Sequence, residues 1–167
     1  MIVIVLILII FFLLQDGTKA VYKNGRKYRV LKNDKPEEAL LYLEELMKEL
    51  EKFIEYLTIN KILSEPKTVL LNKKIKRLVL GERPNYEKEI GYTVNKGKEI
   101  RVCLRDETGN FIEKDVVLFI ILHEIAHIIT YSYGHTDEFW ENYNQIEKHA
   151  KRYGIVKNLN PVIRCPT

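Results

Sequence analysis

The segment that most constrains the fold is residues 116–129, which is apolar except for His123, Glu124 and His127. An apolar run of this length without turn residues predicts a buried helix, and Gly134 is a suitable residue to end it. Burying two histidines and a glutamate there without a partner would cost several kcal/mol, whereas a bound metal ion would offset that cost. The segment therefore predicts a buried helix that carries a metal site.

The spacing of these three residues is that of the HExxH pattern, His123-Glu124-Ile125-Ala126-His127. Positions four apart on a helix differ by about 40° around its axis, so both imidazoles can reach one ion. Glu124 is rotated away from that direction, and its carboxylate can instead accept a proton from a water bound to the metal. The pattern predicts a Zn²⁺ site in which His123 and His127 are ligands and Glu124 is the general base.

The third metal ligand is expected in the chain that follows this helix. Catalytic zinc usually has three protein ligands and one open position. His135 comes directly after Gly134, where the chain would turn back toward the metal, and we predict it as the third ligand. Glu138 and Glu141 are the competing candidates, since some zinc sites combine two histidines with one glutamate.

The composition is that of a globular protein. With 46% hydrophobic and 30% charged residues, the 167-residue chain can form one domain with a real core. A net charge of +4 is too small to indicate nucleic-acid binding by itself. Cys103 and Cys165 exclude a framework of several disulfides, and we expect two unpaired thiols rather than one disulfide.

Periodicity and turn residues predict the remaining elements. Apolar residues recur at steps of three and four after Asp34, which can cap a helix of about 20 residues. Two short strand-like runs flank a four-residue loop of the kind that closes a hairpin. The predicted elements are a helix from Asp34 to Leu57, a hairpin of residues 92–94 and 99–104, and a third helix from Thr136 to Gly154.

The N-terminus differs from the rest, because residues 2–14 are all Ile, Val, Leu or Phe. This run is long for a strand and near the lower limit of a membrane span. We predict a transmembrane anchor in residues 1–15, with a buried first strand as the alternative. The basic stretch 16–33 would be juxtamembrane, with a hairpin at Asn24-Gly25, and would keep the catalytic domain, residues 34–167, on the cytoplasmic side.

Residues 90–154 resemble the zincin fold, and specifically the WLM and SprT-type families of small zinc metallopeptidases. Compact chains of this kind are also similar to zincin-like proteins of large DNA viruses. The resemblance implies an α+β single domain whose small mixed sheet packs on the HExxH helix and flanking helices. It also implies that His123, His127 and His135 bind zinc, and that residues 99–104 form the strand beside the cleft, where substrate is aligned by strand addition. The residues that carry the resemblance are His123-Glu124-Ile125-Ala126-His127 and Gly134-His135-Thr136-Asp137-Glu138-Phe139-Trp140.

These patterns predict a monomeric, membrane-tethered zinc metallopeptidase that hydrolyses a peptide or protein substrate through a water activated by Glu124. A non-catalytic zinc-binding adaptor at a membrane is one alternative. The other is a DNA-associated protease, suggested by a basic cluster but not by any zinc ribbon. That cluster comprises Lys73, Lys74, Lys76 and Arg77.

Overall fold

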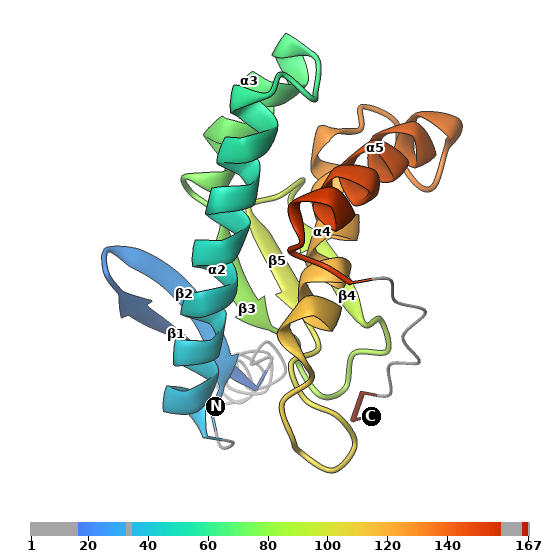
Figure 1. Cartoon of the computed structure of the whole chain (residues 1–167). Helices are drawn as coiled ribbons and strands as arrows, with labels where there is room; N and C mark the ends of the chain where they lie inside the picture. Colours follow the sequence, from blue (N-terminus) through green and yellow to red (C-terminus); the bar gives the residue numbers. More distant parts are fainter. Residues whose placement is uncertain (1–16, 33–34, 158–164, 167) are drawn as a thin grey trace, which may run out of the picture.

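The computed structural model describes residues 17–32, 35–157 and 165–166 of the chain (Figure 1). These ranges form a small α+β domain, as the family resemblance implies. Its elements, in chain order, are β1 (Thr18–Lys23), β2 (Arg26–Leu31), α2 (Pro36–Ile59), α3 (Glu65–Ile75), β3 (Val79–Glu82), β4 (Gly91–Val94), β5 (Glu99–Val102), α4 (Lys114–Ile129) and α5 (Asp137–Tyr153).

The strands form one mixed sheet in the order β1-β2-β3-β5-β4. The two hairpins, β1–β2 and β4–β5, are antiparallel, whereas β3 pairs in parallel with β2 and β5. The crossover from β2 to β3 runs through α2 and α3, the long connection that a parallel pair requires. Because β5 returns between β3 and β4, β4 becomes the edge strand on the side of α4.

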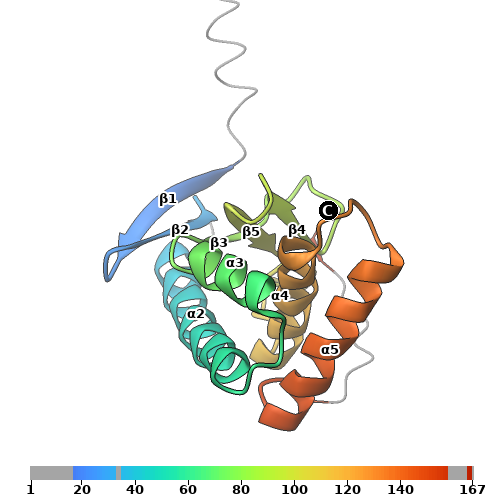
Figure 2. The ribbon, with the colours of Figure 1, turned by 90° about the horizontal axis from the view of Figure 1, so that it is seen from above.

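The helices lie together on one side of the sheet (Figure 2). Helix α2 packs on β2 and β3, and α4 packs on β4 and β5. Apolar side chains from every layer meet in one core, in which Leu50, Leu80, Ile100 and Ile121 are fully buried. The sheet and the core together hold α4 in place, and α4 carries the predicted site.

The stretch predicted to be juxtamembrane contributes two strands to this sheet. The predicted hairpin at Asn24-Gly25 is confirmed, and both turn residues have the positive φ angles, 50° and 74°, of a tight hairpin turn. Because β2 also pairs with β3, these strands are continuous with the sheet of the domain.

The predicted membrane-anchored location is contradicted. Among the described residues, no helix combines the length and the apolar character needed to cross a bilayer. The proposed anchor, residues 1–15, lies outside the described residues. An apolar run near the lower limit of a membrane span was too weak a basis for that prediction.

The predicted helices are confirmed, with one shifted end. Helix α2 begins at Pro36, and its predicted cap, Asp34, lies outside the described residues. Thr136 caps α5 through a hydrogen bond from the Phe139 N–H, and Gly154 ends it with a φ of 85°. Helix α4 ends at Ile129, before the predicted Gly134, because the next residue already has an extended backbone.

The two cysteines form a disulfide, so the prediction of unpaired thiols is wrong. Cys103 follows β5, and Cys165 lies 62 residues further along the chain. The neighbouring Arg83 donates a hydrogen bond of 2.6 Å from Nη2 to the Pro166 carbonyl. The fold brings these two segments together, and the spacing in the sequence contains no sign of that.

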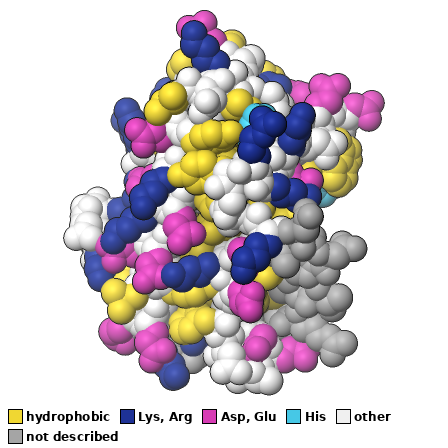
Figure 3. Space-filling model, in the orientation of Figure 1, with side chains coloured by type: hydrophobic (Ala, Val, Ile, Leu, Met, Phe, Trp, Pro, Cys, Tyr) yellow, Lys and Arg dark blue, Asp and Glu magenta, His cyan; other side chains and the backbone are white. Residues whose placement is uncertain are grey.

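Charged side chains of both signs are interspersed on the face shown in Figure 3. The DNA-associated alternative stays a prediction from the sequence.

Candidate active site

Helix α4 fixes the first three residues of the predicted site. His123 and His127 are partly buried, and the side chain of Glu124 is buried between the helix and the sheet. The ring centroids of the two histidines are 5.1 Å apart, as the four-residue spacing predicts. Backbone hydrogen bonds and the apolar residues on either side of the pattern therefore determine where these side chains lie.

The turn between α4 and α5 brings His135 onto the same two rings. Its Nε2 atom lies 3.0 Å from Nε2 of His123, and its ring centroid lies 4.9 Å from that of His127. The ligand nitrogens of the three histidines all lie within 4.8 Å of one another. The residues brought together are thus His123, His127 and His135; neither Glu138 nor Glu141 belongs to the group.

A phenylalanine from α5 supports all three imidazoles. The ring centroid of Phe139 lies 4.9 Å from that of His123, 4.3 Å from that of His127 and 4.7 Å from that of His135. Phe139 is fully buried, while Trp140 stacks on His135 from the solvent side. The Phe139 ring thus packs against all three imidazoles.

Glu138 holds the turn that carries His135. Its carboxylate accepts hydrogen bonds of 3.1 Å from the backbone N–H groups of Tyr131 and Ser132, and one of 2.9 Å from the Ser132 hydroxyl. These bonds stabilise the ionised form and hold the pKa of Glu138 below its usual value. Glu138, a predicted competitor for the metal, is therefore occupied by the backbone of the turn.

A buried polar chain joins the end of α4 to α5 and α3. The Thr130 hydroxyl donates to the Ala126 carbonyl at 2.7 Å and accepts from the Asn142 amide at 2.9 Å. The amide oxygen of Asn142 in turn accepts a bond of 2.6 Å from Lys67 Nζ. These bonds satisfy polar groups at the point where the chain leaves the helix.

The chemistry of the three donors fits a zinc ion. Burial and the two neighbouring imidazoles lower the pKa of His123 to about 4, and burial likewise lowers the pKa of His127. Neutral imidazoles have a free nitrogen lone pair at physiological pH, which metal binding requires. Tetrahedral ligands at zinc–nitrogen distances near 2.05 Å would lie about 3.3 Å apart. Only small ring movements separate the three nitrogens from that arrangement.

Glu124 is suited to proton transfer. Burial, and secondarily the charge of Glu89, raises the pKa of Glu124 to about 7. A carboxyl group with a pKa near neutral can both accept and return a proton under physiological conditions.

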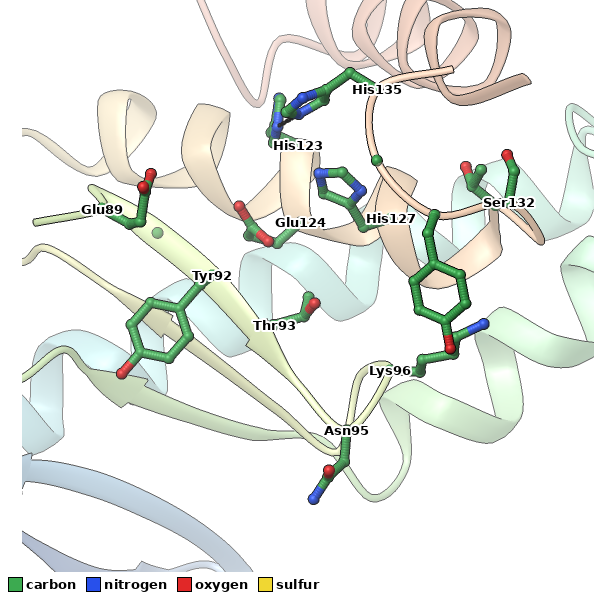
Figure 4. Close-up of a pocket in the computed structure, with 14 residues that line it drawn as sticks. Glu89, Tyr92, Thr93, Asn95, Lys96, His123, Glu124, His127, Ser132 and His135 are labelled. Atoms are coloured by element: carbon green, nitrogen blue, oxygen red, sulfur yellow. Dashed lines mark hydrogen bonds between the residues drawn. The ribbon is translucent and has the colours of Figure 1, made fainter. Parts of the chain in front are cut away.

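An open cavity of about 680 Å³ lies between β4 and the site. Figure 4 shows Glu124 and His127 on the helix side of the cavity and Thr93 on the strand side. The prediction that residues 99–104 form the strand beside the cleft is wrong. Strand β5 lies inside the sheet, and β4, its hairpin partner, lines the cavity.

Two glycines allow β4 and its turn to approach α4 closely. A Cβ atom on Gly91 would lie 2.5 Å from Cγ2 of Ile120, and one on Gly97 would lie 2.6 Å from Cδ1 of Ile128. Ile120 and Ile128 are two helical turns apart and bracket the HExxH residues. The two contacts therefore set the separation of the strand and the catalytic helix.

The sequence patterns did not identify Glu89 or Asn142, and they indicated Phe139 only as an apolar residue of the third helix and as part of the resemblance. Glu89 reaches the cavity from the loop before β4, and no motif marks that position. Asn142 follows Glu138 by one helical turn, so both side chains lie on the same face of α5. This face is turned toward the end of α4, where Asn142 donates to the Thr130 hydroxyl.

One family model, two viral proteins and one solved structure are similar to this chain. A family model described as the WLM domain matches residues 23–159. An uncharacterized protein of Acanthamoeba polyphaga mimivirus is 33% identical over 116 residues, covering 69% of this chain and 55% of that protein. An uncharacterized protein of Invertebrate iridescent virus 6 is 29% identical over 105 residues, covering 60% of this chain and 58% of that protein.

The chain thus spans somewhat more than half the length of these two relatives. Among solved structures, a Wss1 mutant from Saccharomyces cerevisiae is similar in fold, with a TM-score of 0.50 and 21% identity. The similarity covers 75% of this chain and 90% of that chain.

Proposed function

This chain belongs to the WLM domain family, a family of metalloproteases, and on that premise we propose that it is a zinc-dependent peptidase. In this proposal His123, His127 and His135 hold the zinc ion, and Glu124 is the general base. The observation that carries the proposal is the convergence of the three imidazoles beside a buried carboxyl group, all facing one open cavity. The predicted resemblance to WLM metallopeptidases and to proteins of large DNA viruses is confirmed.

Zinc would supply a Lewis acid that polarises a substrate carbonyl and lowers the pKa of a water molecule. Glu124 would accept a proton from the attacking water as its oxygen bonds to the carbonyl carbon. The same carboxyl group would then pass the proton to the amine nitrogen as the carbon–nitrogen bond breaks.

The substrate would be an extended segment of a peptide or protein. Strand β4 is the last strand in the sheet order, so one edge of its backbone faces the cavity rather than another strand. An extended peptide can bind such an edge by adding a strand to the sheet. It would then pass directly over Glu124 and the three histidines.

The test is the substitution Glu124→Gln in zinc-loaded protein, with Glu141→Gln as the matched control. Hydrolysis of a fluorogenic peptide library by Glu124→Gln should fall by at least about 100-fold, because general-base catalysis is removed. Zinc content, measured by atomic emission, should stay at the wild-type level, and Glu141→Gln should behave as wild type. Unchanged hydrolysis in Glu124→Gln would reject the mechanism. A wild-type protein that binds zinc but cleaves no peptide would favour the non-catalytic adaptor.

A further inference from the structure

Two side chains of opposite charge lie at the two ends of the active-site cavity. Glu89 lies two residues before β4, and Lys96 lies two residues after it. Both line the cavity, and Figure 4 shows them on opposite sides of Glu124 and His127. The cavity therefore has an acidic end and a basic end, with the catalytic groups between them.

The carboxylate of Glu89 is available to a ligand. Its side chain is exposed, and it forms no ion pair with any residue in the described ranges. Glu89 lines the same cavity as Thr93 of β4, and Figure 4 shows both residues beside it. Glu89 thus presents a negative charge where the side chain of a bound peptide would pass.

The ammonium group of Lys96 is held in a defined place. It lies 4.1 Å from the ring centroid of Tyr133, and the Lys96 carbonyl accepts a bond of 2.6 Å from Lys74 Nζ. The cation–π contact joins the β4–β5 turn to the loop that carries His135. It does not neutralise the lysine, and no carboxylate among the described residues pairs with it.

We propose that this groove selects its substrate by charge: it binds an extended peptide with a basic side chain at the Glu89 end and an acidic side chain at the Lys96 end. The scissile bond lies between the two. The inference rests on the proposed peptidase function and adds a substrate class to it. Glu89 and Lys96 flank the four residues of β4, Gly91–Val94, so a peptide paired with this strand would contribute at least about four residues between the two charges.

The expected size of each effect is modest, because both charges are partly solvated. Single ion pairs at exposed positions contribute at most about 1 kcal/mol, which corresponds to a preference of roughly two- to five-fold at each end. Opposite charges at the two ends also define a direction, because a peptide bound in reverse would place like charges together.

The test uses the zinc-loaded full chain and fluorogenic peptides that differ only by Arg, Gln or Glu at one position on either side of the cleavage point. Wild type should favour Arg on one side and Glu on the other. Glu89→Lys should invert the first preference alone, and Lys96→Glu should invert the second alone. Lys96→Asn, which better tolerates the positive φ of 48° at this position, should abolish the second preference without inverting it.

The matched controls are Glu107→Lys and Lys98→Glu, which make the same charge changes at exposed residues outside the cavity lining. Both should retain the wild-type preferences. A wild type without charge preference, or ratios that Glu89→Lys and Lys96→Glu leave unchanged, would overturn the inference.

A binding measurement separates this inference from the proposed function. Fluorescence anisotropy of the same labelled peptides on zinc-loaded Glu124→Gln should show the same charge preferences without turnover. Charge-selective binding together with a wild type that cleaves nothing would refute the peptidase and leave the groove assignment standing. Cleavage without charge selectivity would refute the groove assignment and leave the peptidase function standing.

Discussion

The two sides of the metal site are built in different ways. On the helix side, α4 places His123, Glu124 and His127 by backbone hydrogen bonds and by packing in the core. On the loop side, His135 is exposed and lies in a turn held mainly by Glu138 and the α5 cap at Thr136.

This difference shows where each kind of mutation should act. Changes on the helix side alter the packing of strand and helix, and therefore the stability of the whole domain. Changes on the loop side alter how well one ligand is positioned, and therefore the affinity for zinc. The following predictions test that division, from the largest expected effect to the smallest.

The largest loss of stability is expected where the β4–β5 turn meets α4. Gly97→Ala places a methyl group 2.6 Å from Ile128, whereas Gly109→Ala, with the same φ of 82°, meets nothing within 4 Å. Both variants share the cost of a left-handed alanine, roughly 1–2 kcal/mol. Gly97→Ala should lose about 1–3 kcal/mol more through overpacking, measured by urea unfolding. Equal losses in the two variants would show that the close approach to α4 is unimportant.

An intermediate loss of stability is expected from a substitution in the buried polar chain that joins the end of α4 to α5. Asn142 is buried and bonds to Thr130 and Lys67, so Asn142→Ala leaves buried polar groups without a partner. We expect unfolding free energy to fall by about 1–3 kcal/mol. The exposed Asn144→Ala is the control and should change little. Similar small effects in both variants would contradict a structural role for this chain of bonds.

The smallest effect on the fold is expected at Glu138, on the loop side. Glu138→Gln removes the charge that organises the turn, and the amide cannot accept all three hydrogen bonds. Zinc affinity, measured by competition with a chelator, should fall by about ten-fold, as is typical when a group that positions a ligand is lost. Thermal stability of the metal-free protein should change little. A large loss of stability with unaltered zinc affinity would contradict the claim that loop-side changes act on the metal ligand rather than on the fold.

The helix side was the more predictable from the sequence. Its ligand spacing depends on contacts between neighbours in the chain, which local patterns record. The same holds for two features outside the helix side, the hairpin at Asn24-Gly25 and the loop-side cap at Thr136. The disulfide between Cys103 and Cys165, the edge position of β4 and the close contact of Gly97 with Ile128 depend on how distant segments pack.

The loop side shows the same limit within the site itself. His135, Glu138 and Glu141 were all reasonable candidates for the third ligand, because residue type and spacing allowed each of them. What separates them in the structure is that the Glu138 carboxylate binds the N–H groups of Tyr131 and Ser132. The membrane prediction failed for a related reason. An apolar run near the lower limit of a membrane span does not distinguish a membrane segment from a segment buried in protein.

The most direct test of the central claim is the zinc content of His135→Ala, measured beside wild type and His149→Ala after exhaustive dialysis. His149 contacts Tyr56, away from the three-histidine group, and serves as the matched control. Stoichiometric zinc in wild type and His149→Ala, with its loss from His135→Ala, is the predicted result. Full retention of zinc by His135→Ala would contradict the assignment of His123, His127 and His135 as the metal ligands.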